Sequence, residues 1–469
     1  MRLIITLTLL LLCPIISPAL VSASLEAPPV AASSPSVDLL LERAISQNLI
    51  AGGVVVIGNR DGIISTAARG QLSPTDGSPQ LDERSVFDVA SLTKVIATTP
   101  AVMKLVEEGR INLTDPVSQW FPEFAGIDLT VLHLLTHTSG LEDVSVSSEN
   151  PMQSVINKAA AQMPSPGTQF RYADINFILL GELVQRVSGE GLDQFCRERI
   201  YGPLGTQETM FLPPQDPALP IAPTSGYGAG VVQDPNARRL GGVAGHAGLF
   251  SSAYDLSRYA RLLLGGGVLD DKRILSEQAV AQMTTPYLCN NGRVLRGLGW
   301  DIQSAFSAPK GSFFSGVSFG HTGYSGSSIW IDPQQDLFVI LLTRRVNYSE
   351  PKRINQLRRD ISTVAVAGVK MPDLLPGLAD SLEQAAQSAQ AVQVAAPVKK
   401  APARPKLVAK VKPKGKFLQH ARSRSARVER TLAKAGAGRR AARYAHVARV
   451  AKSESCKTTP AKKKRALRK

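Results

Sequence analysis

The sequence predicts an α+β fold of the α/β class, with one antiparallel sheet built from both chain ends and flanked by helices. Two strands are expected near the start, at 51–58 and 63–70, and two near the end, at 327–331 and 337–342. Helical patterns dominate the middle, from about residue 91 to 264. Strands from both ends that flank a helical middle most simply form one sheet with an inserted helical subdomain.

Each strand assignment depends on an apolar run bounded by turn-forming residues. The first two strands are joined by Asn59-Arg60-Asp61-Gly62, and the last two by the segment Asp-Pro-Gln-Gln-Asp at 332–336. Short polar segments of this kind connect neighbouring strands. Helical patterns at 37–47 and 351–366 place one helix before the first strand and one after the last.

Composition separates a globular body from a basic end. The chain has 469 residues, of which 43% are hydrophobic, so it can bury a large core. The net charge of +16 is unevenly placed: residues 399–469 carry 25 Lys and Arg against Glu429 and Glu454, a net of +23, and the rest carries −7. The body therefore gives no electrostatic basis for binding nucleic acid.

The N-terminus has the pattern of a secretory signal peptide. Arg2 precedes an apolar run at 3–12, and Val21-Ser22-Ala23 supplies small residues for cleavage, which predicts a signal at 1–23. The run is too short for a permanent membrane span, which needs about 20 residues. Cys13 does not fit a lipoprotein site, because Leu12 stands where a small residue is needed. We therefore expect a periplasmic or secreted protein.

Three further regions follow the signal: a linker at 24–36, a folded domain at 37–370 and a disordered, Lys/Arg/Ala/Pro-rich tail at 371–469. The tail is either a solvated extension or an electrostatic anchor for an anionic envelope polymer. Such tracts also bind phosphates without sequence preference, but export argues against nucleic acid as the partner.

The cysteines have no metal-binding spacing. Cys13 leaves with the signal peptide, and Cys196, Cys289 and Cys456 remain. Cys196 falls on an apolar helix side and is expected in the core. A disulfide between Cys196 and Cys289 is compatible with export, and the sequence does not decide whether it forms.

The first chemical signal is Ser91 followed three residues later by Lys94, at the start of a helix expected over 92–108. Residues three apart on a helix are neighbours, so the hydroxyl would lie beside the amine. The helix N-terminus would offer a free N–H to a developing oxyanion. To act as a base near neutral pH, Lys94 needs burial or nearby positive charge. Pro100 should kink this helix.

Spacing alone is weak evidence for a Ser/Lys pair, because Ser307 and Lys310 have the same spacing. Pro309 and Gly311 make that second segment a loop, in which the two side chains would not share a helix face. Ser91 differs because it opens an apolar helix near the start of the domain.

Two downstream segments complete the pattern. Tyr172-Ala173-Asp174 precedes a helix at 175–187, and the segment Phe-Gly-His-Thr-Gly-Tyr at 319–324 precedes a strand. Each segment by itself also has an ordinary interpretation. Tyr172 would be a packing residue and Asp174 would cap the helix, and the second segment would be the glycine-rich start of a strand.

Together and in this order, the three segments resemble the active-site motifs of penicillin-recognising serine enzymes: class C β-lactamases, low-molecular-mass DD-peptidases and related esterases. Segments 131–141 and 241–250 add to the resemblance, which covers about residues 38 to 365. It implies a beta-lactamase/transpeptidase-like fold and acyl transfer followed by hydrolysis, with no metal and no organic cofactor. The substrate would be a small molecule or a peptidoglycan-type peptide.

The resemblance also implies roles for single residues. Ser91 would be acylated, and Lys94 and Tyr172 would share proton transfer. The backbone N–H groups of Ser91 and Tyr324 would form the oxyanion hole. The remaining residues that it places beside the substrate are Asp174, His321, Thr322 and Gly323.

Two positions depart from the class C pattern. Asp174 stands where class C enzymes have Asn, and an ionised carboxylate cannot donate to a substrate carbonyl. His321 stands where most have Lys, and histidine is mostly uncharged at pH 7. Both favour a DD-carboxypeptidase-like hydrolase over an efficient β-lactamase. The alternatives are a carboxylesterase or weak β-lactamase, and a catalytically weak envelope-binding protein that uses its basic tail.

Other patterns are assigned ordinary roles. The segment 316–320 matches a nucleophile elbow, but a strand follows where that motif needs a helix. His133 and His137 have helical ligand spacing without a third ligand, which argues against zinc. For His246 we favour a structural loop role over lining the substrate cleft. Arg344 and Asn347 are expected beside the site, either solvated or in reach of a substrate carboxylate.

Overall fold

The computed structural model describes residues 35–375 and 377, apart from 76, 168, 217, 290–293 and the side chains of Leu288 and Cys289. The expected signal peptide and nearly all of the linker and basic tail lie outside the described residues. Within the part of the chain that is described, no helix is both long and apolar enough to cross a membrane.

One eight-stranded antiparallel sheet organises the molecule, as the sequence predicts. Its strands, in spatial order, are β2 (Ile63–Gly70), β1 (Ile50–Gly58), β13 (Leu337–Arg345), β12 (Ser328–Asp332), β11 (Phe319–Thr322), β10 (Asp301–Gln303), β9 (Val294–Arg296) and β8 (Tyr287–Cys289). The pairing of β1 with β13, in which Val55 lies opposite Leu341, joins the two ends of the folded chain.

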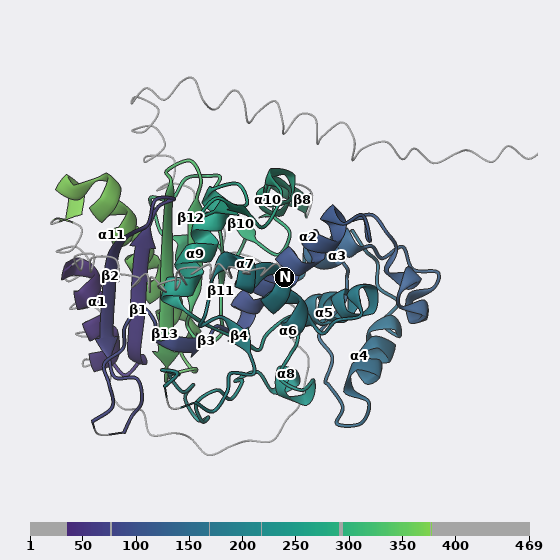
Figure 1. Ribbon diagram of the computed structural model, residues 1–469, viewed down its shortest axis with the longest axis horizontal. Helices are drawn as coiled ribbons and strands as arrows, with labels where there is room; N and C mark the ends of the chain where they lie inside the picture. The colour runs from purple at the N-terminus through teal and green to yellow at the C-terminus, as the bar shows by residue number, and fades with distance from the viewer. Residues whose placement is uncertain are drawn as a thin grey trace, which may run out of the picture. The chain divides into compact units, whose positions relative to one another are not determined.

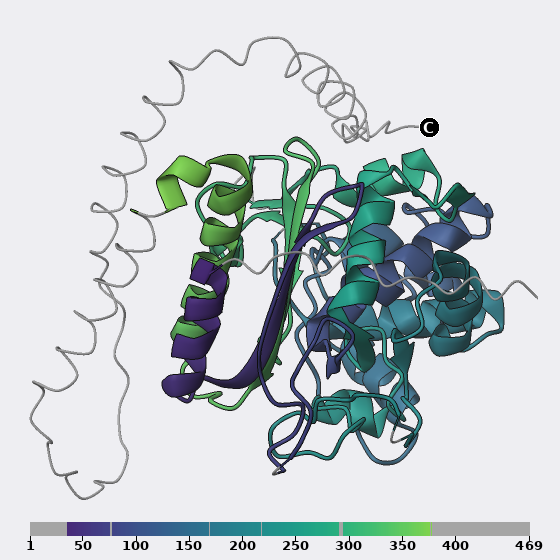
Figure 2. The same cartoon turned by 60° about the vertical axis from the view of Figure 1, so that its left-hand side comes forward.

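Helices cover both faces of this sheet (Figures 1 and 2). The helices α1 (Pro35–Ser46) and α11 (Pro351–Lys370) lie on one face, and α9 (Ala253–Leu264) lies on the other. Successive strand side chains point to opposite faces. In β1, Val55 accordingly belongs to the core under α1 and α11, and Val56 to the core on the α9 side. Both faces are buried, which explains why β1 is apolar throughout.

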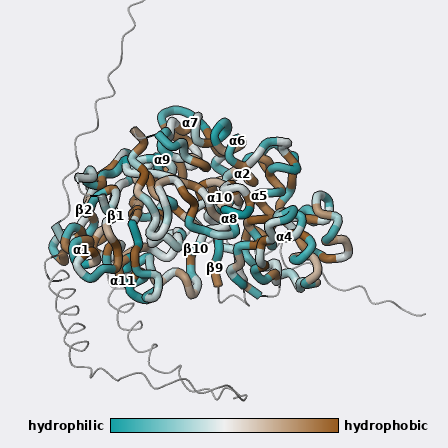
Figure 3. Tube along the Cα trace, turned by 90° about the horizontal axis from the view of Figure 1, so that it is seen from below, coloured by the Kyte–Doolittle hydropathy of each residue, from teal (hydrophilic) through white to brown (hydrophobic). Residues whose placement is uncertain are grey.

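The helical subdomain follows β3 (Val86–Asp88), a strand of a second, smaller sheet, and precedes the later strands of the main sheet in the chain. Its helices are α2 (Thr99–Glu107), α3 (Val131–Leu135), α4 (Pro151–Ala160), α5 (Asp174–Ser188), α6 (Leu192–Cys196), α7 (Gly202–Leu204) and α8 (Pro235–Arg239). A further helix, α10 (Glu277–Thr284), follows α9 in the chain. Two small sheets contain β3 (Val86–Asp88), β5 (Leu249–Ser252) and β4 (Met210–Phe211), and β6 (Val268–Leu269) and β7 (Lys272–Arg273). In Figure 3, hydrophobic and hydrophilic stretches alternate along helices such as α1 and α5, as expected of elements with a buried face.

The expected continuous helix over 92–108 is wrong in its first half. The chain forms a 3₁₀ turn at Ala90–Leu92 and a π-helical turn at Lys94–Thr98 before α2 begins. Pro100 lies in the first turn of α2 and has no N–H to donate to the preceding turn. The strain at Pro100 is therefore relieved by a change of helix type where a kink was expected.

Two buried tyrosines stabilise this π-helical turn. The Tyr259 hydroxyl donates to the Val95 carbonyl at 2.8 Å, and the Tyr201 hydroxyl donates to the Ile96 carbonyl at 3.4 Å. Carbonyls one turn before a proline lose their usual helical partner, and buried carbonyls need another donor. Cys196 is a free, buried thiol 3.6 Å from the Ala97 carbonyl, so it forms no disulfide.

In the second Ser/Lys pair, Ser307 and Lys310 bond to different partners. Ser307 donates to the Asp301 carboxylate at 2.7 Å, and Lys310 donates to the Ile302 carbonyl at 3.3 Å. The pair lies at a short 3₁₀ turn, Ala308–Lys310, as expected for a loop.

Candidate active site

A cavity of about 410 Å³ opens between the Ser91 turn and the end of β11. Six of the eight site residues predicted from the sequence line it: Ser91, Tyr172, His321, Thr322, Gly323 and Tyr324. The other two, Lys94 and Asp174, connect to it through Ser91. The fold therefore brings together segments that lie far apart in the sequence.

Ser91 lies in a turn that is held in an unusual backbone conformation. Ala90 has a positive φ of 48°, which a non-glycine residue rarely adopts. The Asp88 carboxylate accepts from the N–H of Ala90 at 2.8 Å and of Gln233 at 2.7 Å. Burial raises the pKa of Asp88 to about 6. Asp88 thus fixes the Ser91 turn, a role that nothing in the sequence pattern revealed.

Lys94 is fully buried and makes three hydrogen bonds. Its Nζ donates to Ser91 Oγ at 3.1 Å, to Asp174 Oδ1 at 2.7 Å and to the His246 carbonyl at 3.0 Å. Burial alone lowers the pKa of Lys94, but Asp174 and Tyr172 outweigh it and hold the pKa above its ordinary value. The surroundings expected of a free lysine base, which would lower this pKa, are therefore not what the structure provides.

Asp174 is the first residue of α5, yet it does not cap the helix as its position suggested. Its side chain makes no capping hydrogen bond, and Asp143 Oδ1 instead accepts from the Ile175 N–H at 3.0 Å. Burial raises the pKa of Asp174, and the neighbouring Lys94 more than offsets this, so the net pKa is lowered. Asp174 is therefore an ionised partner of Lys94.

The Tyr172 ring lies between Lys94 and His137. Lys94 Nζ is 5.2 Å from the centroid of the Tyr172 ring. The centroid of the His137 ring is 4.5 Å from that of Tyr172. His137 Nδ1 accepts from the Ala173 N–H at 3.3 Å. Burial, assisted by Arg296 and Lys94, lowers the pKa of His137 well below its ordinary value. His137 is therefore a neutral ring that packs against Tyr172.

His321 lies on β11 as a neutral histidine. Its Nδ1–H donates to the Thr322 carbonyl at 2.9 Å, which leaves Nε2 as an acceptor. Burial, with Arg296 and Lys94 nearby, holds the pKa of His321 well below its ordinary value. Its lack of charge agrees with the sequence expectation, and the fixed cations of the cavity are Arg296, Arg345 and Arg358.

Of the two residues expected beside the site, neither lines the cavity. Arg344 donates to the Gln71 carbonyl at 2.7 Å, and the Asn347 amide donates to Glu350 at 2.9 Å. The neighbouring Arg345 lines the cavity instead, because alternate side chains of β13 point to opposite faces of the sheet.

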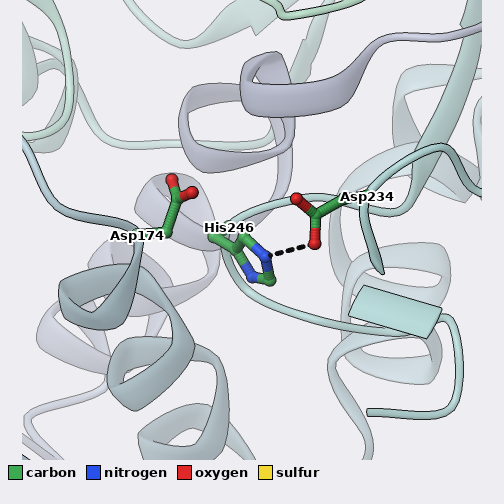
Figure 4. A group of neighbouring side chains, drawn as sticks. All are labelled: Asp174, Asp234 and His246. Carbon is green, nitrogen blue, oxygen red and sulfur yellow. Dashed lines mark hydrogen bonds and ion pairs between the residues drawn. The ribbon is translucent and has the colours of Figure 1, made fainter. Parts of the chain in front are cut away.

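Among the described residues, Asp174, Asp234 and His246 form a group whose possible ligand atoms lie within 4.8 Å of one another (Figure 4). His246 Nε2 lies 3.0 Å from Asp234 Oδ1 and must carry the proton, because a carboxylate only accepts. A protonated Nε2 has no lone pair for a metal, and Lys94 supplies the positive charge opposite Asp174. The three side chains thus belong to the hydrogen-bond network around Lys94, which also donates to the His246 carbonyl, and the structural role of His246 stays a prediction.

Comparisons with known proteins relate the chain to a family and a fold. The chain is 28% identical over 334 residues to a Salmonella agona (strain SL483) protein named "Putative D-alanyl-D-alanine carboxypeptidase", covering 60% of this chain and 76% of that protein. Among solved structures, a penicillin-binding protein homologue from Caulobacter crescentus has a TM-score of 0.58 at 20% identity, covering 70% of this chain and 98% of that one.

A second solved structure, EstCE1, described as a hydrolase with promiscuous acyltransferase activity, has a TM-score of 0.57 at 22% identity, covering 70% of this chain and 97% of that one. At these identities both structures establish the fold alone, which is the beta-lactamase/transpeptidase-like fold expected from the sequence. The family model named Beta-lactamase matches residues 39–363. Because this match covers more than half of the chain, the protein belongs to the beta-lactamase family of serine hydrolases.

Proposed function

We propose that Ser91 is the nucleophile of a hydrolase that works through an acyl-enzyme, with D-amino-acid peptides of the peptidoglycan type as its preferred substrates. The observation that carries the proposal is the 3.1 Å hydrogen bond between Lys94 Nζ and Ser91 Oγ, at the wall of a cavity that also contains Tyr172 and the His321-Thr322-Gly323 segment. A serine is a weak nucleophile until a neighbouring base takes its proton.

Proton transfer would involve Lys94 and Tyr172 together. Lys94 is an ammonium at rest, so it releases a proton before it accepts one from Ser91. The Asp174 carboxylate, 2.7 Å away, would take that proton, and Tyr172 lies beside the same nitrogen. Ser91 Oγ then bonds to the substrate carbonyl carbon, the carbon–nitrogen bond breaks, and the proton passes to the leaving amine. Water repeats the sequence, releasing the acid and restoring Ser91.

Stabilisation of the oxyanion would come from the N–H groups of Ser91 and Tyr324. Neither N–H has an acceptor among the described residues. A side chain at Gly323 would come within 2.4 Å of the Val89 carbonyl, so a glycine is needed for the end of β11 to approach the Ser91 turn. This close approach supports two donors converging on one oxygen.

The substrate preference follows from two side chains. Asp174 is engaged with Lys94 and has no proton to donate to a β-lactam side-chain amide, and His321 is neutral. Both features favour a peptidase over an efficient β-lactamase, in line with the name of the Salmonella relative. A carboxylesterase is the second candidate, because the same acyl-enzyme chemistry serves esters. Action in the periplasm or outside the cell remains part of this proposal.

The test uses a fluorescent penicillin and a p-nitrophenyl ester as acylating probes. Wild type should be labelled or turn over the ester, Ser91→Ala should do neither, and Ser307→Ala, from the second Ser/Lys pair, should behave as wild type. Release of D-alanine from a muropeptide would then separate peptidase from esterase. Absence of acylation by both probes in wild type would favour the envelope-binding alternative.

A further inference from the structure

The turn between β11 and β12 carries the N–H of Tyr324. It is closed by the Gly323 N–H, which donates to the Ser327 carbonyl at 2.8 Å, and by the Gly326 N–H, which donates to the Gly323 carbonyl at 3.0 Å. Gly326 has a φ of 101°, a value that requires glycine. The orientation of the Tyr324 N–H therefore depends on the conformation of one five-residue turn.

Arg358, from α11, is bound to this turn almost entirely through backbone carbonyls. Its Nη2 donates to the carbonyls of Gly323 and Ser327, and its Nε donates to that of Gly326 at 3.1 Å. Its remaining bond, from Nη1, goes to the neutral Asn355 at 2.7 Å. Among the described residues no carboxylate pairs with Arg358, and its side chain is 5% exposed.

Burying an unpaired cation in this way is costly. Desolvation, together with the neighbouring Arg345, lowers the pKa of Arg358 to about 9, so at neutral pH it still carries its charge. Unpaired buried charges in proteins need a compensating set of hydrogen bonds. Here that set consists of three carbonyls from a single turn, which places the charge beside one backbone segment in particular.

The Gly323 carbonyl and the Tyr324 N–H belong to the same planar peptide unit. The two bonds point in opposite directions and are fixed relative to each other by the planar peptide, so anchoring the carbonyl oxygen also fixes the direction of the N–H. Hydrogen bonds in series polarise one another, and a cationic donor on the carbonyl makes the N–H a stronger donor. Arg345 provides a contrast, because its Nη1 donates at 3.0 Å to the Tyr324 carbonyl, which belongs to the next peptide.

We propose that Arg358 is a positioning residue that orients and polarises the peptide between Gly323 and Tyr324, and so strengthens the Tyr324 N–H as an oxyanion donor. The inference rests on the proposed acylation of Ser91. It assigns to a helix at the C-terminal end of the domain a part in catalysis that acts through the backbone of the turn.

The test compares p-nitrophenyl acetate with its thiono analogue, O-(p-nitrophenyl) thionoacetate. Sulfur is a weak hydrogen-bond acceptor, so the thionoester gains little from the oxyanion hole. Arg358→Lys keeps a cation but cannot hold three carbonyls in the guanidinium geometry. Its acylation rate with the oxoester should fall about 10- to 100-fold, a part of the loss seen when a whole donor is removed, and with the thionoester by no more than about threefold.

Arg345→Met is the matched control. It removes another buried arginine that donates to a carbonyl of the same turn, but that carbonyl belongs to the peptide after the one that Arg358 binds. Because Arg345 also lines the cavity, the variant is expected to change the rates with both esters by the same factor and to leave the ratio of oxoester to thionoester rates at the wild-type value. Arg358→Gln is the second variant, and thermal unfolding of each establishes that it is folded.

Equal losses with both esters in Arg358→Lys would mean that Arg358 only supports the fold, and would overturn the proposal. An Arg345→Met variant whose rate ratio falls as far as that of Arg358→Lys would overturn it as well. If wild type is not acylated at Ser91 by the oxoester, the proposed function itself fails, which the mass of the protein after incubation reveals separately.

Discussion

Lys94 and Asp174 form a buried ion pair in which Nζ lies 2.7 Å from Oδ1, while the same nitrogen donates to Ser91 Oγ at 3.1 Å. The carboxylate stabilises the ammonium form of Lys94, and the nucleophile needs the amine form. The identity of residue 174 therefore controls the pH at which Lys94 can act. An asparagine at this position would remove the negative charge that is hydrogen-bonded to Lys94.

Asp174→Asn should shift the pH dependence of acylation to lower pH. Asp174 raises the pKa of Lys94, so its removal lowers that pKa and the amine form appears earlier, by about 1 to 3 pH units for a charge at this distance. The measurement is the rate of ester acylation between pH 6 and 10. Asp143→Asn, which removes the carboxylate that caps α5, is the control and should shift the profile less. A profile that stays in place in Asp174→Asn would contradict the role given to this pair.

Tyr172→Phe should lower the acylation rate by about 100-fold or more, the usual contribution of a proton-transfer group. The ring and its packing against His137 are retained, so the melting temperature should change little. Stopped-flow measurement with a chromogenic ester gives the rate. Tyr227→Phe, at a tyrosine that contacts Arg238, serves as the control for loss of a hydroxyl. A near-wild-type rate in Tyr172→Phe would leave Lys94 as the only proton carrier.

Asp88 should make the protein less stable as pH rises from about 4 to 6. Its folded-state pKa of about 6 exceeds the ordinary 3.8, so the folded protein holds a proton that the unfolded chain has released. This stabilisation is complete below the unfolded pKa and is lost as pH rises through the folded one, an effect of at most about 3 kcal/mol. Urea unfolding at several pH values should show the free energy of unfolding of wild type falling relative to that of Asp88→Asn over this range. A constant difference would argue that Asp88 does not titrate there.

Tyr259→Phe should destabilise the protein by about 1 to 3 kcal/mol, the cost of leaving a buried carbonyl without a donor. The hydroxyl of Tyr259 bonds to Val95 at 2.8 Å in the π-helical turn, while that of Tyr201 reaches Ile96 at 3.4 Å. Tyr201→Phe should therefore cost less, and denaturant unfolding of both variants measures the order. Equal stability of Tyr259→Phe and wild type would mean that water replaces the hydroxyl.

A variant that ends at residue 398 should lose salt-sensitive retention on a matrix of lipopolysaccharide or anionic wall polymer. The removed segment carries a net charge of +23 and the remainder −7, so the attraction reverses sign. Elution in a sodium chloride gradient measures retention. Equal retention of the full-length and shortened proteins would exclude the tail as the anchor, and the shortened protein should keep its ester hydrolysis.

The elements with the clearest patterns were those that the sequence predicted best. The valine-rich strand β1 and the strand β13 appear where their apolar runs lie, and they pair as the predicted sheet requires. The start of α2 was mispredicted, because periodicity does not reveal whether a proline in a helical run produces a kink or a change of helix type. That outcome depends on the two tyrosine hydroxyls from distant helices.

The candidate site shows the same division. Ser91, Lys94, Tyr172 and the segment at 321–324 were found from local spacing and order. All of them except Lys94 line one cavity, and Lys94 bonds to Ser91. The sequence identified Asp174 as a site residue but not its pairing with Lys94. The capping role expected of Asp174 is filled by Asp143, which lies in a preceding loop. Asp88 and Arg358 left no local signal, since each acts on backbone groups that are close only after folding.

The sequence by itself determined the sheet formed from both chain ends, the order of the motifs and the chemical types available at the site, because these follow from local periodicity and from residue identity. Only the tertiary structure decided the charge state of Lys94 and the arrangement of the donors around Tyr324. Those properties depend on burial and on contacts between residues far apart in the sequence, such as Lys94 with Asp174 and Gly323 with Arg358. Such contacts arise only when the chain folds.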